Sequence, residues 1–138
     1  MIKVLKFGGT SVGSAANMKK VAEIVRREQA RITVLSAMSG TTDSLVRISR
    51  AAASGDRNAI EEQLAMLTDK YTRCIEELLR ERKQQALARM NATFGLIRDE
   101  AAAFAEYESE RKIIAQGELL TSAIFTAYLQ ETGLKAEC

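Results

Sequence analysis

The residues of this chain that could do chemistry begin near its start, where a lysine stands just before two glycines. An apolar run ends in the string Lys6-Phe7-Gly8-Gly9-Thr10-Ser11, and a helical period begins a few residues later. A glycine-rich turn between a strand and a helix leaves backbone N–H groups free to point at an anion, and the helix dipole adds to the attraction. Lys6 would add a mobile positive charge. We interpret the stretch as a phosphate cradle.

The cradle matches neither of two common nucleotide signatures. A Walker A loop places its lysine after the glycines, whereas Lys6 precedes them. The dinucleotide fingerprint needs a glycine where this chain has Thr10. On the residues alone, a tight turn and a ligand site are about equally good explanations of Gly8-Gly9.

Two further positions could bind a ligand, and each has a simpler structural explanation. The small, hydroxyl-rich loop of residues 36–40 leads into a helix start at which Thr42 could be an N-cap. Glu118 follows Gly117 at the start of the last expected helix, where an acid complements the helix dipole. Taken singly, both residues are better explained as helix-start residues than as ligand groups.

The hydrophobic pattern predicts the elements that position the first two stretches. Residues 1–7 and 31–36 read as short buried strands, and apolar residues at helical spacing predict a helix over 14–29 with Ser14 as its N-cap. A strand, helix and strand of these lengths form a βαβ unit, so the strands should be parallel with a right-handed crossover. Their carboxyl ends then open at one edge, where α/β folds bind ligands.

The rest of the chain reads as helical. A helix over 41–54 is followed by two long helices with apolar stripes, an αα-hairpin insertion over 57–112 with its turn near 81–85. A further helix is predicted over 117–132, and 134–138 reads as the start of the next strand. The expected fold class is α/β, with a parallel βαβ start and mostly helical content.

Composition narrows the classes of function. The 138 residues suit a single domain, and the net charge is +2 with 5% aromatic residues, which favours neither nucleic acid nor a membrane surface as a partner. We expect a cytoplasmic protein, because no apolar run is long enough for a membrane span and no signal peptide is seen. Without histidine, a Ser-His or Cys-His nucleophile system is excluded within this chain. Cys74 reads as a helix-packing residue, and no metal-ligand set is predicted.

Three stretches together resemble a known family. Residues 6–12, 34–42 and 116–119, in this order and separated by a helical excursion of this size, closely resemble the N-terminal part of aspartokinases. These amino-acid-kinase superfamily members phosphorylate the side-chain carboxylate of L-aspartate from ATP, in the biosynthetic branch leading to lysine, threonine and methionine. The resemblance covers the whole chain and implies the N-terminal portion of an α/β/α sandwich. Aspartokinases are much longer, so we expect a catalytic-domain fragment that does not turn over alone.

The resemblance implies a role for each matching residue, with ATP and Mg²⁺ as the cofactors. On the phosphate side, Lys6 would neutralise charge on the β- and γ-phosphates while the phosphoryl group moves. The other residues implied in ATP binding border the same phosphates: Phe7, Gly8, Gly9 and Ser11.

On the aspartate side, Ser36 and Ala37 would border the acceptor, Thr42 would hydrogen-bond a substrate carboxylate, and Glu118 would pair with the ammonium group. These roles outweigh the helix-start explanations given above. Two alternatives remain open: a related kinase acting on glutamate, carbamate or a nucleotide, and a non-catalytic helical module that self-associates through residues 57–111. A homodimer built on the hairpin is compatible with either kinase reading.

Overall fold

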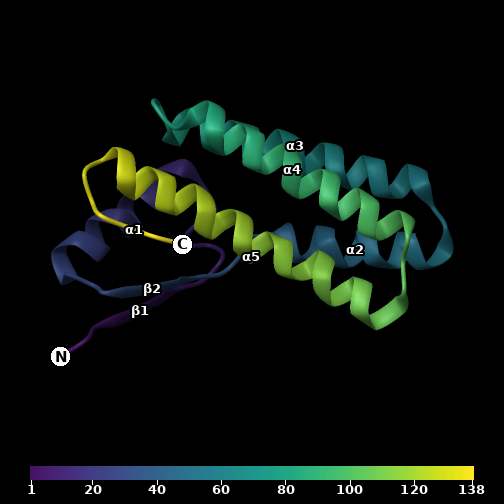
Figure 1. The fold of residues 1–138 in the computed structure, drawn as a ribbon, viewed down its shortest axis with the longest axis horizontal. Coiled ribbons are helices and arrows are strands. Elements are labelled where there is room, and N and C mark those ends of the chain that lie inside the picture. The colour runs from purple at the N-terminus through teal and green to yellow at the C-terminus, as the bar shows by residue number, and fades with distance from the viewer.

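A computed structural model describes residues 1–138, and its N-terminal part is the predicted βαβ unit. Strand β1 (Val4–Phe7) and strand β2 (Ile32–Leu35) are joined through helix α1 (Ala15–Glu28). The strands pair in parallel, with Val4 opposite Ile32 and Phe7 opposite Leu35, which confirms the predicted pairing. Only four residues of the first apolar run form a strand, and each of them pairs with one of the four residues of β2. Figure 1 shows the two strands on one side of the molecule.

Local capping fixes the limits of α1 close to the prediction. Ser14 is the N-cap, and its hydroxyl accepts a hydrogen bond from the backbone N–H of Asn17 at 3.1 Å. Gln29 ends the helix in the left-handed conformation, and its N–H bonds the last carbonyls. An N-cap hydroxyl satisfies one of the free donors at a helix start, so Ser14 defines where α1 begins.

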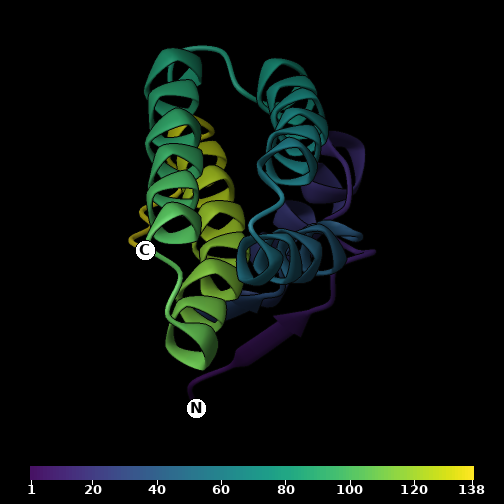
Figure 2. The ribbon, with the colours of Figure 1, turned by 90° about the vertical axis from the view of Figure 1, so that its right-hand side faces the viewer.

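Four more helices complete the chain: α2 (Thr41–Ser54), α3 (Arg57–Leu78), α4 (Lys83–Ala102) and α5 (Glu106–Glu131). Helix α3 packs against both α2 and α4, and α5 packs against α2, α4 and β2. Figure 2 shows α4 and α5 running side by side. The α/β class, the parallel start and the mostly helical content are therefore confirmed.

Three predicted boundaries were wrong. The hairpin turn lies at residues 79–82, slightly ahead of the predicted 81–85, because α3 ends at Leu78 and α4 already begins at Lys83. Helix α5 begins at Glu106, not at residue 117, because Ser109 and Ile113 extend its buried face toward the N-terminus. The hairpin therefore ends at 102 instead of 112.

Residues 134–138 form no strand in the structure, because the sheet consists of β1 and β2 alone and neither pairs with this segment. The segment instead follows the end of α5, where Leu134 N–H donates to the carbonyl of Leu129 at 2.9 Å. None of the five helices combines the length and the apolar character needed to cross a membrane.

The core runs from the sheet into the helices. Tyr71 is fully buried, and its ring meets that of Phe94 edge to face with centroids 5.9 Å apart. Leu5 and Phe7 pack toward this core, whereas Val4 and Val34 on the other sheet face are 56% and 46% exposed. Side chains alternate along a strand, so Lys6 shares the exposed face with Val4.

The two cysteines are expected to differ sharply in reactivity. Cys74 lies in the core with its Sγ 3.9 Å from the Sδ of Met18, and burial raises the pKa of its thiol to about 11. Cys138 is exposed. Because the thiolate is the reacting form, a native sample should release one equivalent of chromophore with the thiol reagent DTNB, and the second only in denaturant. Two equivalents released at equal rates from the native chain would contradict this packing.

Candidate functional site

The three stretches singled out in the sequence meet at Ala37. A Cβ atom placed on Gly9 would lie 2.8 Å from the carbonyl oxygen of Ala37. One placed on Gly117 would lie 3.0 Å from the Cβ of Ala37. The loop after β1, the loop after β2 and the middle of α5 are therefore in direct contact, although their residues are far apart in the sequence.

The glycine-rich loop uses its carbonyl groups within the protein and leaves its N–H groups free. Gly9 O accepts the N–H of Ser39 at 3.1 Å, and Thr10 O accepts the N–H of Gly13 at 3.2 Å and the side-chain amide of Asn17 at 3.0 Å. The backbone N–H groups of residues 8–12 donate to no protein acceptor. A run of unused donors ahead of the start of α1 is the arrangement that binds an anion.

Two side chains beside this loop are also without a partner. Lys6 lies in β1 opposite Val34, is exposed, and forms no hydrogen bond or ion pair within the protein. The hydroxyl of Ser11 is exposed and likewise makes no intramolecular hydrogen bond. The ammonium group of Lys6 is thus available to a ligand rather than committed to a structural ion pair.

On the other side of Ala37, the second loop runs from the end of β2 into α2. The N–H of Ser36 donates to Phe7 O at 3.1 Å and so extends the ladder, while its side chain is half-buried and unbonded. Gly40, with φ of 82°, is the N-cap of α2 and provides no side-chain cap. The N-cap explanation for Thr42 is therefore wrong, because Thr42 lies within the first turn, exposed and with its hydroxyl unbonded.

Glu118 lies one residue beyond the contact of Gly117 with Ala37, in the middle of α5. The explanation of Glu118 as a first-turn dipole partner is wrong, because Glu106 and Glu108 occupy the first turn. Its carboxylate is exposed and forms no ion pair. An acid that serves neither the helix dipole nor a salt bridge is available to a cationic ligand group.

Two residues of α3 that support the site were missed from the sequence. Lys70 donates from its Nζ to the carbonyl of Ser39, and the hydroxyl of Tyr71 lies 2.9 Å from Oγ1 of Thr41. Tyr71 reads as part of an apolar stripe and Lys70 as part of a solvated helix face, so neither carries a motif signal. Their contacts span 31 and 30 residues of sequence and depend on the tertiary fold.

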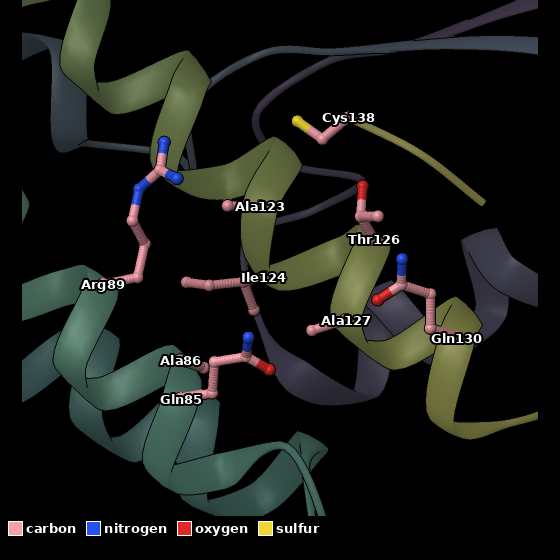
Figure 3. Close-up of a pocket in the computed structure, with 9 residues that line it drawn as sticks. All are labelled: Gln85, Ala86, Arg89, Ala123, Ile124, Thr126, Ala127, Gln130 and Cys138. Carbon is pink, nitrogen blue, oxygen red and sulfur yellow. The ribbon is translucent and has the colours of Figure 1, made fainter.

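The larger hollows of the structure lie away from the predicted ligand residues. One of about 450 Å³ is lined by Ser14 at the start of α1 and by Lys70 and Arg73 of α3. Another of about 370 Å³ lies between α4 and α5, where Arg89 and Gln85 face α5 and Cys138 (Figure 3). Neither hollow is lined by any of the nine residues that the sequence assigned to ligands.

Comparison with known proteins gives a consistent result. The model of the amino acid kinase family matches residues 1–137. The aspartokinase of Chlamydia muridarum is 31% identical over 97% of this chain and 29% of its own length. Aspartokinase 1, chloroplastic, of Arabidopsis thaliana is 35% identical over 96% of this chain and 24% of its own.

Solved structures show the same similarity. Aspartokinase III of E. coli in complex with lysine and aspartate superposes with a TM-score of 0.86 and 25% identity, covering 97% of this chain and 30% of that one. The same enzyme in complex with aspartate and ADP gives a TM-score of 0.84 and 26% identity over 99% of this chain. The chain therefore spans less than a third of the length of the relatives it matches.

Proposed function

Because the chain belongs to the amino acid kinase family, we propose that it carries the phosphate- and aspartate-binding corner of an aspartate kinase. In the proposed reaction, a side-chain carboxylate oxygen of L-aspartate attacks the γ-phosphorus of ATP. A new P–O bond forms while the bond to the β-phosphate oxygen breaks, giving 4-phospho-L-aspartate and ADP. The aspartate and ADP held by E. coli aspartokinase III support this choice of ligands. The proposal covers the part of the reaction for which these 138 residues carry groups, which is the binding of the phosphates and of aspartate.

The contact of Ala37 with both Gly9 and Gly117 carries the proposal, because it brings the glycine-rich loop next to the turn of α5 that bears Glu118. On the phosphate side, the free N–H groups of residues 8–12 would bind phosphate oxygens, and Gly9 lets the two loops approach closely. Lys6 would neutralise the charge that moves during transfer. Positioning and charge neutralisation are the main contributions to phosphoryl transfer.

On the acceptor side, the groups match the charges of aspartate, which has two carboxylates and one ammonium. The hydroxyl of Thr42 and the backbone N–H groups of Thr42 and Asp43 would donate to a carboxylate, since neither N–H group has a protein acceptor. Ser36 would border the amino acid, and Glu118 would accept from the ammonium. The nucleophilic carboxylate is already ionised at neutral pH, so the chemistry needs no histidine base.

Mg²⁺ enters this proposal only as the partner of ATP. No group of three or more acidic or cysteine side chains in the chain could hold a metal ion. Mg²⁺ commonly binds through substrate phosphates and few protein ligands. We therefore assign no residue of this chain to the metal and derive no step from it.

An NMR titration of the ¹⁵N-labelled chain with L-aspartate tests the proposal. Shifts are expected around residues 36–42 and Glu118, with weaker responses to succinate, which lacks the ammonium, and to L-glutamate. A charge-assisted hydrogen bond is worth about 1.5–3 kcal/mol, so Glu118→Gln should weaken binding by roughly 10-fold or more. The matched control is Glu110→Gln, which changes another α5 carboxylate that forms no ion pair.

Equal responses to succinate and L-aspartate, or equal affinities of the Glu118→Gln and Glu110→Gln variants, would exclude the aspartate assignment. A stronger response to L-glutamate would instead favour the related kinase class. A coupled ADP-release assay completes the test, and the 138 residues alone are expected to give no turnover.

A further inference from the structure

Two consecutive residues of α3 contact the loop that joins β2 to α2. Lys70 donates from Nζ to the carbonyl of Ser39, and the hydroxyl of Tyr71 lies 2.9 Å from Oγ1 of Thr41. The two contacted residues, Ser39 and Thr41, lie on either side of Gly40, directly before Thr42. The helical hairpin is thus bonded to the loop that separates the proposed phosphate and amino acid sites.

Lys70 is linked to the glycine-rich loop after β1 through a single residue, Ser39. Ser39 donates its N–H to Gly9 O at 3.1 Å and accepts from Lys70 at its own carbonyl, so it is bonded on both sides. Lys70 is half-buried and has no ion-pair partner, although Asp69 and Glu77 line the same hollow. Burial lowers the pKa of this ammonium. An ammonium removed from water and bonded to a neutral carbonyl carries a desolvation cost that a purely solvated lysine would avoid.

Tyr71 is linked to the proposed amino acid site through a single residue, Thr41. Its side chain is fully buried, and its hydroxyl bonds the buried Thr41. The Cγ2 of Thr41 lies 3.2 Å from the point where a Cβ on Gly117 would stand. One chain of contacts therefore runs from α3 through Thr41 to the part of α5 that bears Glu118.

We propose that Lys70 and Tyr71 are positioning residues, Lys70 for the phosphate loop through Ser39 and Tyr71 for the acceptor site through Thr41. Their effect on ligands rests on the proposed function, whereas the bonds themselves do not. Neighbouring residues on a helix point about 100° apart, so one turn of α3 can hold both sides of the site at a fixed separation. The hairpin then helps to set the spacing between the phosphate donor and its acceptor.

The test compares five variants with the wild-type chain. Lys70→Met removes the donor, Lys70→Arg restores one, and Tyr71→Phe removes only the hydroxyl. Arg73→Met is the control on the same helix and hollow, and Tyr128→Phe removes a hydroxyl that makes no intramolecular hydrogen bond. Each variant is measured by residue-resolved amide hydrogen exchange without ligand, and by titration with L-aspartate and with tripolyphosphate.

Loss of one net hydrogen bond of about 1 kcal/mol corresponds to roughly a five-fold change. Lys70→Met should therefore speed exchange at Ser39 by roughly five-fold or more and weaken tripolyphosphate binding, with rescue by Lys70→Arg. Tyr71→Phe should speed exchange at Thr41, whose N–H donates to Met38 O at 3.0 Å, and weaken aspartate binding. The two controls should change neither quantity.

Exchange rates at Ser39 and Thr41 that stay at wild-type values would overturn the proposal. It is equally overturned by faster exchange spread evenly over all helices, because that is what a general loss of stability produces. If the wild-type chain binds neither ligand, both the kinase assignment and the proposed effect of Lys70 and Tyr71 on binding fail. The exchange data still decide whether the two bonds hold the loop.

Discussion

Gly9→Ala is expected to separate the loops that follow β1 and β2 and to weaken tripolyphosphate binding at least 10-fold, while Gly8→Ala leaves the contact between the two loops unchanged. The new Cβ would lie 2.8 Å from Ala37 O and 3.3 Å from the backbone nitrogen of Ser39. Both are backbone atoms of the adjoining loop, so relief requires the loops to move apart. Overpacking of this kind typically costs about 1–3 kcal/mol of folding stability.

Gly8→Ala is the matched control, because a Cβ on Gly8 meets no atom within 4 Å. Urea unfolding should show a lower midpoint for Gly9→Ala and an unchanged or slightly higher one for Gly8→Ala, since alanine restricts the unfolded chain more than glycine does. An unfolding midpoint and a tripolyphosphate affinity of Gly9→Ala that both stay at wild-type values would show that the loops are not held together at Gly9.

Local physical chemistry was enough to predict the N-terminal unit. The period-two and period-3.6 patterns flank a glycine-rich turn, and Ser14 is a strong N-cap, so strand, helix and strand follow from neighbouring residues alone. The start of α5 was not predictable in this way. Gly117 looks like a helix boundary in sequence, yet it lies inside α5, at a point where Ala37, Leu45 and Thr41 leave no room for a side chain.

The candidate site likewise divides into residues that the local sequence could identify and residues that it could not. Lys6 and the glycines carry a signal in their own neighbourhood, because a strand-turn-helix context already suggests an anion. Glu118 and Thr42 carry none, and only the family resemblance selected them over helix-start roles. The contact of the Tyr71 hydroxyl could not be predicted for a different reason. The ring of Tyr71 belongs to the apolar stripe of the core, and only the fold brings Thr41 to its hydroxyl group.

Gly117→Ala is expected to destabilise the chain by about 1–3 kcal/mol and to weaken aspartate binding, whereas Gly95→Ala should stabilise it by about 0.5–1 kcal/mol. At Gly117 the added Cβ would lie 3.0 Å from Ala37 Cβ, 3.1 Å from Leu45 Cδ1 and 3.2 Å from Thr41 Cγ2. With close atoms from both the loop and α2, relief requires α5 to move away from them, and the turn that bears Glu118 moves with it. A Cβ on Gly95, inside α4, would have no atom within 4 Å, so the change in stability comes only from the higher helix propensity of alanine.

The comparison separates a contact effect from an effect of helix propensity, because both substitutions put alanine inside a helix. Urea unfolding should give midpoint changes of opposite sign, and the aspartate titration should respond to Gly117→Ala alone. A Gly117→Ala variant that is stabilised like Gly95→Ala would mean that α5 does not press on Ala37. The packing of α5 on the loop after β2, on which the proposed placement of Glu118 depends, would then be lost.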